Sequence, residues 1–131
     1  MASLHIDHWQ GQSNQGEEIA DASEKELATA IDRLDGWNHT NVSLEDGAGR
    51  VLMIGGGPDR FLIQHLLPED TGAWVAVGDA DAEGEEVLTL GRQEADYPKR
   101  HIVSKTVALN AGLAFLRDGG QSPNVAWERS F

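Results

Sequence analysis

Apolar and polar residues alternate with two different periods along this chain. Leu4 and Ile6 alternate with polar neighbours, which is typical of a short strand. The polar stretch 11–18 follows and predicts a loop. Ser23 and Glu26 have the spacing of a helix capping box, and apolar residues then recur at helical spacing. The sequence therefore predicts a first helix just after this box.

The middle of the chain, from residue 37 to residue 103, carries short apolar segments separated by turn residues. This pattern is typical of consecutive antiparallel strands. The loop Asp46–Gly49 contains two glycines and predicts a hairpin connection, and 68–72 predicts another turn. The expected strands cover residues 41–45, 50–54, 60–66, 73–77, 86–90 and 100–103.

Helical periodicity returns at residues 104–117, where apolar side chains surround most of the expected helix. The helix should therefore be largely buried, and Gly119 should end it. A last strand is expected at 124–128, with Val125 and Trp127 on one face. We predict a single α+β domain over residues 1–131, a curved antiparallel sheet of about six to seven strands with two α-helices on one face.

Composition narrows the class of partner. Ten Lys and Arg against 22 Asp and Glu give a formal net charge of −12, which favours a basic protein partner over nucleic acid or an anionic membrane. The chain has no Cys, which fits a reducing compartment. No apolar run approaches the roughly 20 residues of a membrane span, and the first residues do not form a secretory signal. We therefore expect a cytoplasmic protein.

Two loops have the composition of ligand sites. Gly55–Gly57 follow an apolar strand and could cradle a phosphate, but the residues after them alternate like a strand, so we predict a tight strand connection. Asp79, Asp81 and Glu83 have the spacing of a calcium loop, whose twelfth position is Leu90 where a carboxylate is required. We predict an exposed acidic loop there.

Candidate metal and catalytic residues do not form a complete set. His5, Asp7 and His8 include two residues on one strand face, but His8 points the other way and no third ligand lies nearby in the sequence. No Gly-x-Ser-x-Gly elbow is present. We expect no metal, no cofactor and no catalytic activity.

Four motifs in a fixed order carry a family resemblance. They are the Gly-Gly ended strand 52–56, the strand 60–63, the late helix 107–116 and the closing segment Pro123–Trp127. Together they resemble the first-numbered family of immunity proteins from bacterial polymorphic toxin systems, over roughly Trp37 to Glu128. The resemblance implies a cytoplasmic antitoxin that binds and blocks a cognate toxin domain, often a nucleic-acid deaminase or nuclease, without a cofactor.

The predicted partner-binding residues follow from charge and aromatic content. A toxin that acts on nucleic acid needs a basic surface, so its inhibitor gains by presenting negative charge. Trp74, opposite in phase to Val75, and Tyr97 are the expected aromatic anchors, and the inhibitor should be a monomer or a weak homodimer. The carboxylates expected to steer the basic toxin domain are Asp79, Asp81, Glu83, Glu85 and Glu86.

Two other classes of function remain open at this point. A nucleic-acid mimic that blocks a DNA-binding protein would share the acidity, and it predicts rows of carboxylates at phosphate-like spacing. A small hydrolase that depends on carboxylates or a metal predicts a concave pocket with perturbed carboxylates.

Overall fold

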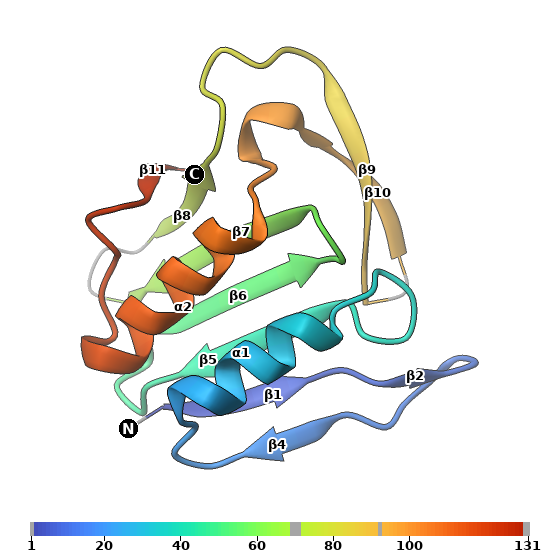
Figure 1. Cartoon of the computed structure of the whole chain (residues 1–131), viewed down its shortest axis with the longest axis vertical. Coiled ribbons are helices and arrows are strands. Elements are labelled where there is room, and N and C mark those ends of the chain that lie inside the picture. Colours follow the sequence, from blue (N-terminus) through green and yellow to red (C-terminus); the bar gives the residue numbers. More distant parts are fainter. Residues whose placement is uncertain (1, 69–71, 92, 130–131) are drawn as a thin grey trace.

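The structure is a computed structural model that describes residues 2–68, 72–91 and 93–129. Within these residues, seven strands form one antiparallel sheet and two α-helices cover one of its faces (Figure 1). The predicted α+β fold is confirmed. In sheet order the strands are β11 (Ala126–Arg129), β8 (Gly72–Val77), β7 (Phe61–Leu67), β6 (Val51–Gly56), β5 (Asn41–Glu45), β1 (Ser3–Ile6) and β4 (Glu17–Ile19).

Both helices begin where their capping residues predict, and the second also ends at its predicted glycine. In α1 (Glu24–Arg33), the Glu26 N–H donates to the Ser23 hydroxyl at 3.1 Å, and the Ser23 N–H donates to the Glu26 carboxylate at 2.9 Å. This is the predicted capping box. At the start of α2 (Lys105–Asp118) the Ser104 hydroxyl accepts from the Val107 N–H at 3.3 Å without a reciprocal bond, and Gly119 ends the helix with a left-handed φ of 74°.

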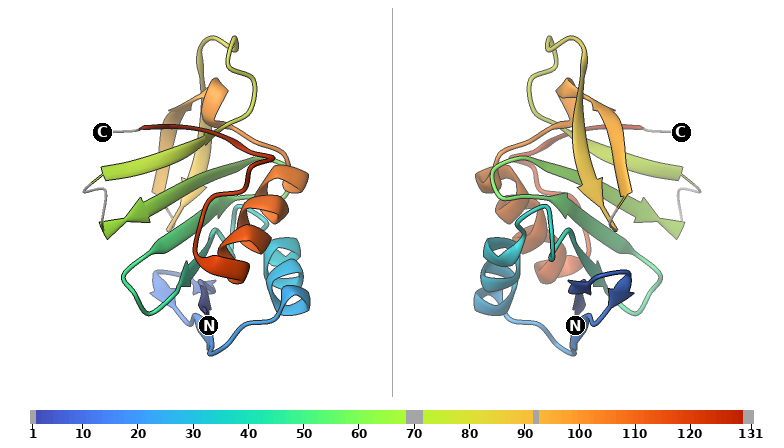
Figure 2. Two further views of the ribbon diagram at one scale, coloured as in Figure 1. Left: turned by 90° about the vertical axis from the view of Figure 1, so that its left-hand side faces the viewer. Right: turned by 90° about the vertical axis from the view of Figure 1, so that its right-hand side faces the viewer.

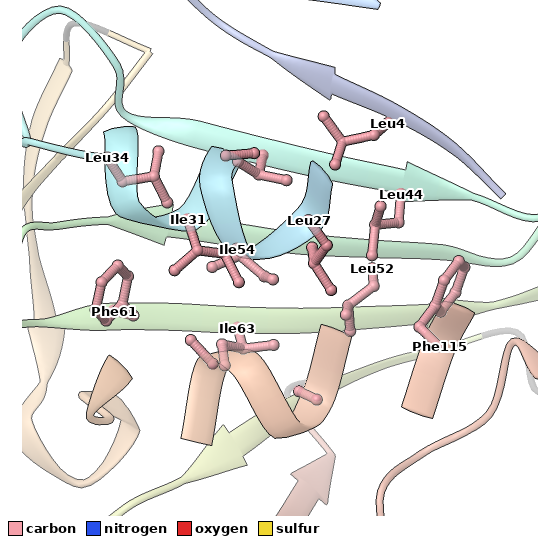
Figure 3. Close-up of a cluster of buried hydrophobic side chains, with 14 of the residues drawn as sticks. Leu4, Leu27, Ile31, Leu34, Leu44, Leu52, Ile54, Phe61, Ile63 and Phe115 are labelled. Atoms are coloured by element: carbon pink, nitrogen blue, oxygen red, sulfur yellow. The ribbon is translucent and has the colours of Figure 1, made fainter. Parts of the chain in front are cut away.

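The main core lies between the helices and the sheet, as Figure 3 shows. Strand register aligns Leu4, Leu44 and Leu52 in one row across β1, β5 and β6, so all three point toward the helices. The helices themselves approach closely, because a Cβ added at Gly112 of α2 would lie 2.7 Å from Leu27 of α1. A small residue at this crossing lets both helices pack onto the sheet.

The opposite face of the sheet carries a second, smaller layer. A hairpin of β9 (Glu85–Leu90) and β10 (Gln93–Pro98) forms its own two-stranded sheet (Figures 1 and 2). Leu88 packs there against Leu62 and Val75, which alternate with the residues that face the helices. The apolar contact between this hairpin and the sheet therefore centres on three buried residues, whereas the core on the helix side is large and contiguous.

The predicted loop at 11–18 is wrong. The segment is a short hairpin of β2 (Trp9–Gln10) and β3 (Ser13–Asn14), and it runs on into β4, which pairs with β1. Its residues are polar because β4 is an edge strand, where backbone pairing does not require buried side chains. Ile19 is the residue of β4 that packs against the core.

The predicted strand at 100–103 is also wrong, and a strand before it was not predicted. Residues Lys99–His101 form a short 3-10 helix, η2, and Val103 makes a single antiparallel bridge with Phe61. The strand β10 is mostly polar because four of its residues, 93–96, are exposed. An alternation rule cannot detect a strand that buries so little.

The glycine segment after β6 is the predicted strand connection. The Gly56 N–H donates to the Thr40 carbonyl at 2.9 Å and the Gly57 N–H to the Arg60 carbonyl at 2.7 Å. Both glycines have φ near +100°, which favours residues without a Cβ. These two N–H groups therefore donate to carbonyls within the fold. The other predicted turn, at 68–72, lies mostly outside the described residues.

Candidate interaction surface

The predicted acidic loop joins β8 to β9 at one end of the molecule. Asp79, Asp81 and Glu83 are exposed, and the Asp81 N–H donates to the Asp79 carboxylate at 3.0 Å. The loop is tied to η2 at both ends. The Gly78 N–H donates to the Arg100 carbonyl at 2.8 Å, and the Lys99 N–H donates to the Gly84 carbonyl at 3.0 Å.

The outer face of the β9–β10 hairpin extends this acidic loop. Strand alternation places Glu85 and Val87 on that face of β9, and the register pairs Val87 with Asp96 of β10. Val87 is 48% exposed, which is unusual for a large apolar side chain. We call the exposed carboxylates of the loop and hairpin the acidic strip: Asp79, Asp81, Glu83, Glu85, Glu94 and Asp96.

Glu86 and Tyr97 lie on the inner face of the same hairpin. They are directly opposite each other in the register, and Tyr97 packs against the small Leu62, Val75 and Leu88 cluster. Glu86 forms an ion pair with Arg60 at 3.2 Å. Both side chains therefore hold the hairpin against the sheet, and they do not share the outward face of the acidic strip.

Trp74 lies on the other side of the sheet from the hairpin. Register pairs it with His65 and Arg129, and His65 contacts Phe115 of α2, so this row faces the helix side. Trp74 is half-buried, and the Arg129 guanidinium lies 5.2 Å from its ring centroid. The predicted phase opposite to Val75 is confirmed, but Trp74 does not lie beside the acidic strip.

Two arginines near the acidic strip are paired with carboxylates outside it. Arg60 contacts Glu86 and Asp59, and Arg100 contacts Glu128 at 3.1 Å. Hydrogen bonds from His101 and then Arg100 lower the pKa of Glu128 below its ordinary value. The direct ion-pair partners of these two arginines are therefore not carboxylates of the strip.

The loop between α1 and β5 presents a residue that the sequence patterns did not single out. Trp37 is 65% exposed, and it lies in a turn closed by the Asp35 carboxylate. One oxygen of Asp35 accepts hydrogen bonds from the N–H groups of Trp37, Asn38 and His39, at 2.8, 3.0 and 3.1 Å. Partial burial acts to raise the pKa of Asp35, but these three donors outweigh it and the pKa is lowered.

A second carboxylate, Asp7, anchors the end of this turn. It accepts from the N–H groups of Thr40 and Asn41, at 2.6 and 2.9 Å, and from the indole N–H of Trp9 at 2.7 Å. The Thr40 hydroxyl also donates to Asp7, and it accepts from the N–H of Gly91 at the hairpin tip at 2.8 Å. These bonds link the Trp37 turn to both the β1 end and the hairpin.

The histidines considered as metal ligands have other partners. His5 contacts Glu18 at 3.4 Å, while the ring of His8 lies 4.7 Å from that of His39. Asp7 is engaged in the hydrogen bonds just described. Across the described ranges, no three His, Asp or Glu side chains are placed so that they could hold a metal ion together.

A polar pocket of about 400 Å³ lies at the β4 edge of the sheet. His5, Asp7, Glu17 and Glu18 contribute to its lining. A hydrogen bond and charge from Arg33 lower the pKa of Glu17, and their side chains approach to 2.6 Å. A general acid needs a raised pKa, so Glu17 is poorly suited to that role.

Comparison with models of known protein families gives one match. Residues 15–129 match the model described as Immunity protein Imm1. This chain belongs to the Imm1 family. No curated protein matches the sequence. The Imm1 match begins before the motifs that first indicated it, which start at Trp37, and it includes β4 and α1.

Membership of the Imm1 family gives the general role of the protein. It is an immunity protein, which binds a cognate toxin protein and acts as an inhibitor. The helices of the described chain, of 10 and 14 residues, are too short and insufficiently apolar to cross a membrane. The exposed carboxylates of the acidic strip and the exposed side chains of Val87 and Trp37 are the candidate groups of this surface.

Proposed function

We propose that this Imm1 protein neutralises a basic, nucleic-acid-acting toxin domain, a deaminase or a nuclease, in the cytoplasm. The acidic strip would cover the basic surface with which the toxin holds phosphates. The observation that supports this proposal is the gathering of exposed carboxylates from two separate segments, residues 79–85 and 94–96, on one end of the fold.

The concentration of charge can be compared with an even distribution. The described surface is 6976 Å², and one side of a standard interface covers about 800 Å², or roughly one-ninth of it. The 22 Asp and Glu spread evenly would place about two or three carboxylates on such an area. The strip offers six, which is enough to raise the association rate with a basic partner well above the uncharged rate.

The two alternative functions have less support. A nucleic-acid mimic would present extended rows of carboxylates. On β10 only two exposed carboxylates alternate in a row, Glu94 and Asp96. A hydrolase would use a pocket with a carboxylate of raised pKa, and Glu17 has the opposite shift. The family match itself favours inhibition over catalysis.

The proposal is tested with the cognate toxin domain of this protein. The Asp79→Lys, Glu83→Lys double variant should associate about ten-fold more slowly than the wild type at about 20 mM salt. The difference should shrink toward 300 mM, since the Debye length falls to several ångströms at such ionic strength. Stopped-flow association rates across the salt series measure this.

A matched control separates the strip from net charge. Glu24→Lys with Glu45→Lys changes the formal charge by the same amount, and both residues are exposed and distant from the loop. This control should slow association much less. Equal slowing by both double variants, or no slowing by either, would contradict a role for the acidic strip.

A further inference from the structure

Two large apolar side chains are exposed among the described residues, Trp37 and Val87. The hairpin that carries Val87 is joined to the Trp37 loop by the Gly91 to Thr40 hydrogen bond of 2.8 Å. In Figure 1 the hairpin and the loop after α1 lie along one side, and the right-hand view of Figure 2 looks onto that side.

The Trp37 turn is held in one shape before any partner arrives. Three backbone N–H groups of the turn bind Asp35, and the N–H groups of Asp35 and Gly36 both donate to the His39 carbonyl, at 3.0 and 3.2 Å. The Trp9 N–H also donates to the Asn38 carbonyl at 2.8 Å. Because the loop is already ordered, binding through it loses little conformational entropy.

A fixed, exposed Trp is the kind of residue that dominates binding energy. Interface hot spots are enriched in Trp, and they act by filling an apolar pocket that the surrounding contacts keep dry. The secondary apolar group, Val87, lies opposite Asp96 on the hairpin, and an apolar side chain next to a carboxylate matches a partner pocket rimmed by basic residues.

We infer that Trp37 is the principal anchor by which this protein holds its toxin, with Val87 as a secondary anchor. The inference rests on the proposed function and identifies the part of the surface that sets the lifetime of the complex. The partner it requires is a toxin domain with an apolar pocket bordered by Lys or Arg. Charge on the acidic strip governs how fast the complex forms, and the Trp37 indole governs how slowly it separates.

The test measures association and dissociation rates separately for the cognate toxin domain. Trp37→Ala should raise the dissociation rate by about 30-fold or more and leave the association rate within about two-fold. Val87→Ser should raise the dissociation rate by about three- to ten-fold. The matched variant Trp37→Phe keeps an aromatic ring and should restore most of the lifetime.

A positioning variant tests the ordered turn. Asp35→Ala removes the acceptor for three N–H groups without touching the indole, so the dissociation rate should rise while amide exchange at Trp37, Asn38 and His39 becomes faster in the free protein. No change in either quantity would contradict the role of this turn.

The outcomes distinguish the anchor from the function it rests on. If the Trp37→Ala variant binds tightly and dissociates at the wild-type rate, Trp37 is not the principal anchor, and the proposed function still stands. If Trp74→Ala raises the dissociation rate strongly and Trp37→Ala does not, the inference is also wrong, and the anchor is Trp74 on the other face of the sheet. Absence of binding between the wild-type protein and this toxin domain would instead overturn the proposed function.

Discussion

The two faces of the sheet are covered in different ways. On one face, α1 and α2 bury a contiguous core that includes Leu52 and Ile54. On the other, the β9–β10 hairpin buries three residues and leaves its own outer face charged. The helix face therefore stabilises the fold, while the hairpin face needs only enough contact to hold charged and apolar groups in place for a partner.

This difference explains why the proposed binding surface can be so acidic. Like charges that lie close together repel, and their repulsion lowers the stability of whatever element carries them. The acidic strip lies on a hairpin and a loop outside the seven-stranded sheet, so its repulsion acts on an element that contributes little to the main core. A fold arranged in this way tolerates strong local charge.

The largest expected effect comes from the helix face. Leu52 is 1% exposed in the centre of the main core, and Leu52→Ala should lower the free energy of unfolding by about 3 to 5 kcal/mol. Chemical denaturation measured by circular dichroism tests this. A loss below about 1 kcal/mol would contradict the dominance of this face.

The same substitution on the hairpin face sharpens the comparison. Leu88 is 3% exposed, yet Leu88→Ala should cost less than about 2 kcal/mol, because the hairpin can open without unfolding the sheet. Amide exchange should become faster in β9 and β10 and stay unchanged in β6. Equal losses from Leu88→Ala and Leu52→Ala would show that the two faces unfold as one unit.

The smallest expected effect is the pH dependence of one ion pair on the hairpin side. Glu128 has a lowered pKa because His101 and Arg100 bind its charged form. Its contribution is therefore present above the ordinary carboxylate value of 4.5 and is lost as the pH falls through the lower folded value. Glu128→Gln should lower Tm by less than about 3 °C at neutral pH. It should leave Tm unchanged at acidic pH, where the Glu128 carboxylate is protonated.

The control for this measurement is Glu45→Gln, which removes one negative charge on β5, four strands away from β11 in the sheet. Melting curves between about pH 7 and pH 3 compare the two variants. A Glu128→Gln effect that persists after the carboxylates are protonated would show that the contact acts by packing and not by charge.

Local rules were sufficient for the regular part of the fold. The Ser23–Glu26 box, the Gly119 stop and the strand 41–45 were predictable because a cap, a left-handed glycine and strict alternation depend on nearby residues. The same rules missed β4 and β10, whose residues are polar. Pairing along a sheet edge or in an exposed hairpin is made by backbone groups, which every residue carries.

The candidate site divides in a similar way. The exposed loop with Asp79, Asp81 and Glu83 follows from composition, because a dense acidic segment between strands must be solvated. The sequence also contained a local signal for Trp37, since Asp35 and Gly36 before it favour a turn, but exposure of an indole cannot be inferred from turn residues alone.

By itself, the sequence determined the helices, most of the strands, the negative charge and the family. Tertiary structure alone decided which groups share a surface: it placed Glu94 and Asp96 beside the acidic loop, turned Tyr97 inward and put Trp74 on the opposite side of the sheet. The physical reason is that alternation shows which side chains of one strand share a face. The pairing of distant strands then decides which part of the molecule that face contacts.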